Sequence, residues 1–309
     1  MRRSRLTATR FTHNRQLALH LTQSRALRRF SIGVRSMLED YQQRFVAAVG
    51  RVIAANWLQK PPPIRLLDMG CDCSGRQLAE ISRLIRGTAV GINIPESFPS
   101  AAAIESAGPQ VQLVQMDGMH LTFPDNTFDL VVSSNVIEHV PDPARFIREA
   151  ARVLKPNGVC YMETAPVWSG PRGHHIMECM VAENCPEESN FRDDGLIIPD
   201  WSHLSLSRQQ MAEVIGGKVL PGTREYILHY LYDTADLNKQ PWSVIRQAFE
   251  NAFPIVRLHT GPLREADESR KPTDAVEDYS VYGFDAVCRK QPQGWLSARL
   301  SRWLRRIGL

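Results

Sequence analysis

A short apolar segment that runs into an acid and a glycine turn constrains the fold of this chain more than any other feature. Residues 64–67 are Ile-Arg-Leu-Leu, and Asp68 and Gly70 follow them. The apolar run predicts a buried parallel strand, while Gly70 and Gly75 let the backbone turn tightly and approach a ligand. We expect a helix from about Arg76, with the N–H groups of its first turn facing the ligand. The segment therefore predicts the edge of a nucleotide pocket.

The spacing of this turn discriminates between nucleotides. A dinucleotide-binding enzyme would have Gly-x-Gly-x-x-Gly here, but Asp72 occupies the second glycine position, where a pyrophosphate would meet a carboxylate. An acid at Asp68, two residues before Gly70, instead suits a ligand that carries an ammonium group and a sulfonium. The residues predicted to contact the ligand along this turn are Asp68, Gly70, Cys71, Ser74 and Gly75.

These residues resemble the class I S-adenosylmethionine-dependent methyltransferases, in particular the broad methyltransferase type 11 family. The resemblance implies an α/β fold with a doubly wound, Rossmann-like, mostly parallel sheet and an antiparallel edge strand. It also implies S-adenosyl-L-methionine as the cofactor. An NAD-linked oxidoreductase is disfavoured by Asp72.

Further motifs follow in the family's order. Residues 88–93 predict a second strand, and Asn93 lies near the offset of roughly 20 residues at which a ribose-binding residue is expected. Family members usually have Asp or Glu there; an amide still bonds a ribose hydroxyl, but without the charge-assisted strength of a carboxylate. After a third strand over 111–116, the resemblance implies that Asp117 accepts from the adenine amino group. The predicted cofactor residues at these strand ends are Asn93, Ile94, Asp117 and Gly118.

The stretch 121–129, Leu-Thr-Phe-Pro-Asp-Asn-Thr-Phe-Asp, is the most recognisable match to the family. It is a Pro-Asp-Asn turn that leads into a fourth strand over 130–134, whose end places Ser134 and Asn135 at the cofactor. The remaining predicted elements are a helix over 143–154, a turn over 155–158, a strand over 159–164, helices over 207–215 and 242–253, and strands over 254–260 and 280–290.

The two ends differ in composition from the rest of the chain. Residues 1–36 contain nine arginines and no acid, which suits a solvated extension, a transit peptide, a nucleic-acid or membrane-seeking arm, or an overextended start. A helix over 37–60 is predicted from a capping box at 36–39. Within the tail 291–309, Trp295 to Leu309 predicts a basic amphipathic helix that could dock on its own domain, hold a lipid-linked substrate or rest on an anionic membrane.

Charge and composition limit the partners. The net charge of +4 comes largely from the two ends, and no recognition motif appears, so no nucleic-acid partner is expected. No apolar run approaches the roughly 18 residues of a membrane span. The six cysteines are scattered, without a disulfide framework or a zinc-ribbon spacing. We therefore expect a cytoplasmic protein, with any membrane association through the tail.

Residues 37–290 are expected to form the methyltransferase domain: a cofactor-binding core over 64–166, a substrate region over 167–252 and terminal strands over 253–290. Open α/β sheets bind ligands beyond the carboxyl ends of their strands, so the segment after the fifth strand faces the active site. Its first part, to about residue 199, is long and polar and is expected to be a lid rather than core.

Methyl transfer from a sulfonium mainly needs alignment of donor and acceptor and exclusion of water. An oxygen or nitrogen acceptor can also need a base, for which histidine is suited. His174 and His175 follow the fifth strand and are the first candidates, with His139 after them. Glu-His-Val-Pro is common in the family, so His139 could instead only fix its loop or contact the cofactor.

No metal site is expected. Glu138 and His139 are similar to ubiquinone-pathway O-methyltransferases, in which a Glu-x-x-Glu-His arrangement can hold a divalent ion, but Asn135 replaces the first glutamate. His174, His175, Cys179 and Cys185 lack a repeated ligand spacing.

Together these features predict S-adenosylmethionine-dependent methyl transfer to a small-molecule, lipid-linked or glycan-linked acceptor, at oxygen or nitrogen rather than carbon. The alternative is a non-catalytic protein that binds S-adenosylmethionine or S-adenosylhomocysteine for regulation or assembly. Two positions support that alternative: Asp72 occupies a glycine position of the nucleotide turn, and Asn93 replaces the usual Asp or Glu.

Overall fold

The computed structural model describes residues 40–57, 63–100, 108–192, 194–273 and 277–291. The arginine-rich segment 1–36, the capping box at 36–39 and the basic helix predicted from Trp295 lie outside these residues. Among the helices of the described residues, none combines the length and the apolar character needed to cross a bilayer.

A seven-stranded sheet organises the chain, in the order β3-β2-β1-β4-β5-β7-β6. All strand pairs from β3 to β5 are parallel, whereas β7 pairs antiparallel with both β5 and β6. This confirms the mostly parallel, Rossmann-like sheet with antiparallel pairing at one edge. The strands are β1 (Ile64–Met69), β2 (Gly87–Asn93), β3 (Val111–Gln115), β4 (Phe128–Ser134), β5 (Leu154–Thr164), β6 (Ile255–Gly261) and β7 (Gly283–Arg289).

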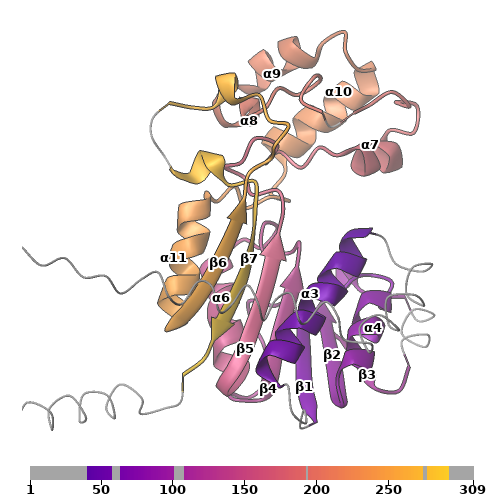
Figure 1. Cartoon of the computed structure of the whole chain (residues 1–309). Helices are drawn as coiled ribbons and strands as arrows, with labels where there is room; N and C mark the ends of the chain where they lie inside the picture. Colours follow the sequence, from indigo (N-terminus) through magenta and orange to yellow (C-terminus); the bar gives the residue numbers. More distant parts are fainter. Residues whose placement is uncertain (1–39, 58–62, 101–107, 193, 274–276, 292–309) are drawn as a thin grey trace, which may run out of the picture.

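Helices cover both faces of the sheet (Figure 1). α3 (Asp40–Asn56) and α4 (Arg76–Leu84) pack on one face, where Phe45 and Leu78 are fully buried. α6 (Pro143–Val153) and α11 (Trp242–Ala252) pack on the other face around Ile147 and Phe249. Burial on both faces explains why consecutive apolar residues occur in the middle of these strands, at 66–67 in β1 and at 130–132 in β4.

The turn predicted over 155–158 is wrong, because these residues belong to β5. The ladder is irregular here, with a register shift between Phe128 and Leu130. The end of β7 supplies the reason: the Lys290 N–H donates to the Gly158 carbonyl at 3.0 Å, and the Asn157 N–H donates to the Lys290 carbonyl at 2.9 Å. A long-range strand partner thus extends a segment that looks like a turn from its Pro-Asn-Gly sequence.

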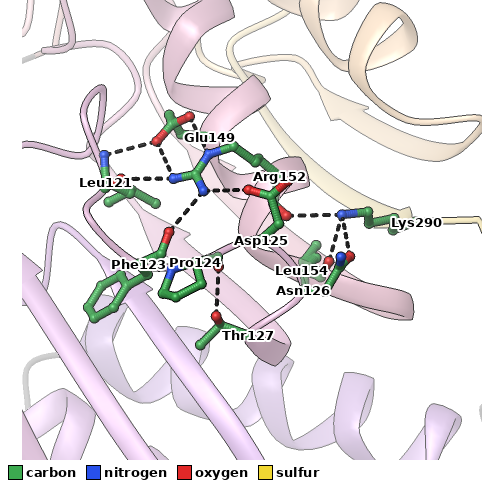
Figure 2. Close-up of polar contacts among 10 residues, drawn as sticks. All are labelled: Leu121, Phe123, Pro124, Asp125, Asn126, Thr127, Glu149, Arg152, Leu154 and Lys290. Atoms are coloured by element: carbon green, nitrogen blue, oxygen red, sulfur yellow. Dashed lines mark hydrogen bonds and ion pairs between the residues drawn. The ribbon is translucent and has the colours of Figure 1, made fainter.

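The family-like stretch 121–129 is clamped to α6 by one arginine (Figure 2). The Arg152 guanidinium donates to both carboxylate oxygens of Glu149 at 2.8 Å. It also donates to the backbone carbonyls of Leu121 and Phe123, each at 2.8 Å, and to Asp125 Oδ1 at 2.7 Å. The stretch that most clearly carries the resemblance therefore has a structural role.

The segment between β5 and α11 lies beyond one end of the sheet (Figure 1). It contains α7 (Glu178–Asn184), α8 (Ser202–Ser205), α9 (Arg208–Ile215), α10 (Pro221–Leu228) and a π-helical turn, His229–Asp233. Three short 3-10 turns elsewhere are Pro95–Ser97, Glu268–Arg270 and Glu277–Ser280.

This segment has a hydrophobic cluster of its own. Ile176, Val181 and Phe191 are buried there against Met211 of α9 and Ile227 of α10. Those first three residues fall in the stretch that was expected to be a lid rather than core. The expectation that the stretch is not core is therefore wrong. Although it is largely irregular, apolar residues scattered through its polar sequence contribute side chains to this cluster.

Candidate cofactor cleft

A cleft of about 670 Å³ opens where β1, β2 and β4 end. Its volume lies in the range of small-molecule sites. Eight of the residues predicted to bind the cofactor line it, namely Gly70, Cys71, Asn93, Ile94, Asp117, Gly118, Ser134 and Asn135. They meet because parallel strands bring their carboxyl ends to one edge of the sheet.

The turn after β1 needs glycine at position 70. Gly70 has φ +85°, and a Cβ there would lie 2.3 Å from Cγ2 of Val136. The N–H groups of Gly70 and Cys71 both donate to the Ile92 carbonyl, at 2.9 and 3.0 Å. The predicted tight turn is therefore present, and it brings the turn after β1 against the turn after β4.

The expectation of free N–H groups at the start of α4 is wrong for its first two residues, since the Arg76 N–H donates to the Ser74 hydroxyl at 3.3 Å and the Gln77 N–H is also bonded. The Asp72 carboxylate accepts from the N–H of Ser74 at 3.2 Å and from the N–H of Gln77 at 3.3 Å, and it also binds the Ser74 hydroxyl. The acid at the second glycine position thus caps the helix itself. The Asp72 carboxylate occupies N–H groups that a pyrophosphate would need and adds a negative charge that would repel it.

Three of the predicted cofactor residues, Asp68, Ser74 and Gly75, are not part of the cleft lining. Ser74 and Gly75 shape the turn, and Gly75 has φ +66°. Asp68 is fully buried, and neither carboxylate oxygen has a hydrogen-bond partner among the described residues. Burial, reinforced by the charge of Asp72, raises the pKa of Asp68 well above its usual range. A direct cofactor contact by Asp68 stays a prediction.

Asn93 braces two turns of the cleft. Its Nδ2 donates to the Cys71 carbonyl at 2.8 Å and to the Ser97 carbonyl at 3.1 Å, and its Oδ1 accepts from the Ile94 N–H at 2.8 Å. An aspartate could not make the two donated bonds. The amide at the predicted ribose position therefore holds the cleft wall together.

We expect Asn93→Asp to lower the free energy of unfolding by about 2 kcal/mol, because a carboxylate would face two carbonyl oxygens. Urea denaturation measures this change. Asn184→Asp is the matched control, since Asn184 donates one exposed bond to Met180 outside the cleft. Equal stability of Asn93→Asp and the native protein would contradict the bracing role.

Asp117 and Ser134 lie where the prediction puts them, and both have protein partners. Asp117 accepts from the Met119 N–H at 2.8 Å and pairs with His120 Nδ1 at 2.9 Å. The Ser134 hydroxyl donates to Glu163 at 3.3 Å.

The three candidate bases occupy different environments. His139 is exposed and lines the cleft, but His174 and His175 are 1% and 4% exposed and are not part of its lining. Burial lowers the pKa of His174 well below its usual value and that of His175 to about 3. Such groups are poor bases at neutral pH. His174 and His175 are therefore unsuited to act as bases, because the segment after β5 buries both side chains away from the cleft.

His203 is a third buried histidine, 5.4 Å from the His174 ring centroid, and burial lowers its pKa to about 4. The unfolded chain takes up a proton near pH 6.5, so this histidine stabilises the fold above that pH and loses the contribution as pH falls toward 4. Its Nε2 donates to the Trp168 carbonyl at 2.8 Å. His203→Gln retains a donor and does not titrate, so its stability should fall less than the native protein's between pH 7 and pH 5, by urea denaturation. Equal pH dependence of the two proteins would contradict this role.

Sequence reasoning missed several residues of this region. Tyr41 of α3 and Phe146 of α6 line the cleft. Asn238 Nδ2 donates to the carbonyls of Ile137 and Val140 at 2.7 and 2.8 Å and so holds the turn after β4. Tyr41 and Phe146 lie in helices that the sequence predicts, but the contacts of Asn238 join segments far apart in the sequence.

Comparison with known proteins agrees with this geometry. Residues 67–162 match a sequence family described as a methyltransferase domain. An uncharacterized methyltransferase of Mycobacterium leprae is 30% identical over 147 residues, which cover 44% of this chain and 54% of the relative. Another, from Mycobacterium sp. strain JLS, is 44% identical over 75 residues, covering 23% of this chain and 29% of the relative. The chain thus spans about half, or less, of the length of these relatives.

The sheet order, the glycine turn and the matched segment support membership of the class I S-adenosylmethionine-dependent methyltransferases. Within that class, residues 67–162 are similar to the family described as a methyltransferase domain.

Two solved structures show the range of structural similarity. The CurJ carbon methyltransferase is 14% identical with a TM-score of 0.46, covering 80% of this chain and 54% of that chain. The YcgJ protein from Bacillus subtilis is 17% identical with a TM-score of 0.39, covering 80% and 99%.

Proposed function

We propose that this protein transfers the methyl group of S-adenosylmethionine to an oxygen or nitrogen of a small-molecule, lipid-linked or glycan-linked acceptor. The observation that carries the proposal is the cleft at the ends of β1, β2 and β4, formed by the predicted residues. A second cleft of about 530 Å³ adjoins it and shares Tyr41 and Asn135. Two adjoining clefts suit a donor and an acceptor.

The chemistry of the first cleft fits the cofactor. Apolar side chains of Ile94, Met116 and Phe146 could contact a purine ring, and the Asp117 carboxylate could accept from its amino group. The carboxylate of Asp72 favours a ligand with positive charge over one with phosphates. When bound, S-adenosylmethionine would supply an electrophilic methyl group.

The second cleft has polar and charged side chains that suit a polar acceptor. Arg44, Glu163, His259 and Asp285 line it together. Burial raises the pKa of Glu163, and the Tyr161 hydroxyl donates to this carboxylate at 2.5 Å. A carboxylate with a raised pKa beside the donor cleft could accept a proton from an acceptor hydroxyl or amine.

The test is transfer of a labelled methyl group. The purified protein would be incubated with methyl-labelled S-adenosylmethionine and separate small-molecule, lipid and glycan extracts, with S-adenosylhomocysteine as the readout. We expect release of S-adenosylhomocysteine with at least one extract and a loss of about tenfold or more in Glu163→Gln. Glu213→Gln, which changes an exposed residue of α9, is the control. Absence of release with all extracts, despite cofactor binding, would overturn the proposal.

That last outcome would favour a non-catalytic protein that binds S-adenosylmethionine or S-adenosylhomocysteine. One observation favours this alternative: Asp72 and Asn93, the two positions that depart from the family pattern, both use their side chains to hold backbone groups of the protein.

A further inference from the structure

Three potential metal ligands converge beside the cofactor cleft. Glu138 and His139 lie in the turn after β4, and His175 lies in the segment after β5. Each offers one ligand atom, and the three atoms lie within 4.8 Å of one another. Ligand atoms about 2.1 Å from one ion are roughly 3.0–3.5 Å apart, so modest side-chain rotations would close the site.

The Glu138 carboxyl group is buried, and Thr164 and His139 are polar neighbours that act on it. The residue is 4% exposed, and neither carboxylate oxygen has a hydrogen-bond partner among the described residues. Burying an unpaired carboxylate is costly. Its backbone is fixed independently, because the Glu138 carbonyl accepts from the Asn238 N–H at 2.9 Å. The turn thus holds a buried carboxyl group, without a hydrogen-bond partner among the described residues, beside two imidazoles.

The two histidines are oriented as metal ligands usually are. His139 Nδ1 is 2.8 Å from the Asp236 carbonyl, and His175 Nε2 is 2.8 Å from the Pro166 carbonyl. A carbonyl oxygen only accepts, so each of these nitrogens carries the proton. The opposite nitrogen of each ring therefore has a free lone pair. A second-shell backbone carbonyl that fixes the tautomer in this way is typical of metal-binding histidine.

We infer that Glu138, His139 and His175 bind a divalent transition-metal ion at the wall of the cofactor cleft. Two imidazoles and one carboxylate suit Zn²⁺, Fe²⁺ or Co²⁺, whereas Mg²⁺ and Ca²⁺ prefer sets of oxygen ligands. Three protein ligands would leave at least one coordination position of the ion open. Because His139 also lines the cleft, a water or a hydroxyl of the acceptor could occupy that position. Asn135 stands where a first glutamate ligand would be, but that ligand is not needed, since His175 supplies the third ligand from the segment after β5.

Cobalt titration of the untagged, chelator-treated full chain tests the site. Co²⁺ should produce visible absorption bands that saturate at one equivalent with micromolar affinity, and Zn²⁺ but not Mg²⁺ should displace it. His139→Ala and Glu138→Gln should each weaken Co²⁺ binding by at least tenfold, and circular dichroism checks that both variants fold. His229→Ala, which removes an exposed histidine paired with Asp233 away from both clefts, should bind Co²⁺ as the native protein does.

Three results would overturn the inference: no micromolar Co²⁺ binding by the native protein, unchanged binding in folded His139→Ala and Glu138→Gln, or an equal loss of binding in His229→Ala. S-adenosylhomocysteine binding, measured on the same samples without metal, reports separately on the proposed function.

Discussion

Replacing Gly70 with alanine is expected to abolish S-adenosylmethionine binding, lowering the affinity by at least a hundredfold. Gly70 has φ +85°, and an added Cβ would lie 2.3 and 2.8 Å from the two methyl carbons of Val136. The left-handed backbone alone costs a side chain roughly 1–2 kcal/mol. The clash adds displacement of Val136, which is also part of the cleft wall. Calorimetric titration of the folded variant measures the loss.

Gly217→Ala separates backbone strain from the clash. Gly217 has φ +75°, and a Cβ there would meet no atom within 4 Å. This variant should lose about 1 kcal/mol of stability and bind the cofactor as the native protein does. Native-like binding by Gly70→Ala would show that the turn after β1 does not form the cofactor site.

Removing the Arg152 guanidinium should destabilise the fold by about 3 kcal/mol. Arg152→Ala would delete the bonds to Glu149, Asp125 and two backbone carbonyls (Figure 2). Glu149 would then keep its charge, with the Leu121 N–H as its remaining hydrogen-bond donor among the described residues. Hydrogen bonds to charged groups contribute about 1.5–3 kcal/mol each, although such contributions do not add fully. Urea denaturation measures the change.

Arg148→Ala is the control on the same helix. The Arg148 side chain is 62% exposed and is 3.9 Å from Asp142 at its closest ion-pair distance, so its loss should cost no more than about 0.5 kcal/mol. If the two variants were equally stable, the Arg152 network would not be the clamp that holds the stretch 121–129.

Most of the sheet could be predicted because its signals are local. Apolar runs bounded by glycine, proline and aspartate give β1, β2 and β4, and parallel pairing then brings the strand ends together. Eight predicted cofactor residues line the cleft for this reason.

The remaining features depend on contacts between distant segments. From the sequence, Asp72 is an unfavourable residue in a phosphate-binding turn. In the structure, its carboxylate accepts hydrogen bonds from the N–H groups of Ser74 and Gln77 at the start of α4. The inward packing of His174 and the meeting of His175 with Glu138 depend on how the segment after β5 folds, which its irregular sequence does not encode locally. Likewise, nothing near Asn238 in sequence points to the turn after β4 that it holds.

Calorimetric titration would show whether the cleft binds S-adenosylmethionine. The purified native protein would be titrated with S-adenosylmethionine, with S-adenosylhomocysteine and, as a control, with NADH. We expect the native protein to bind the two adenosyl ligands with micromolar affinity and not to bind NADH. Absence of binding by both adenosyl ligands, or binding of NADH at similar affinity, would contradict it.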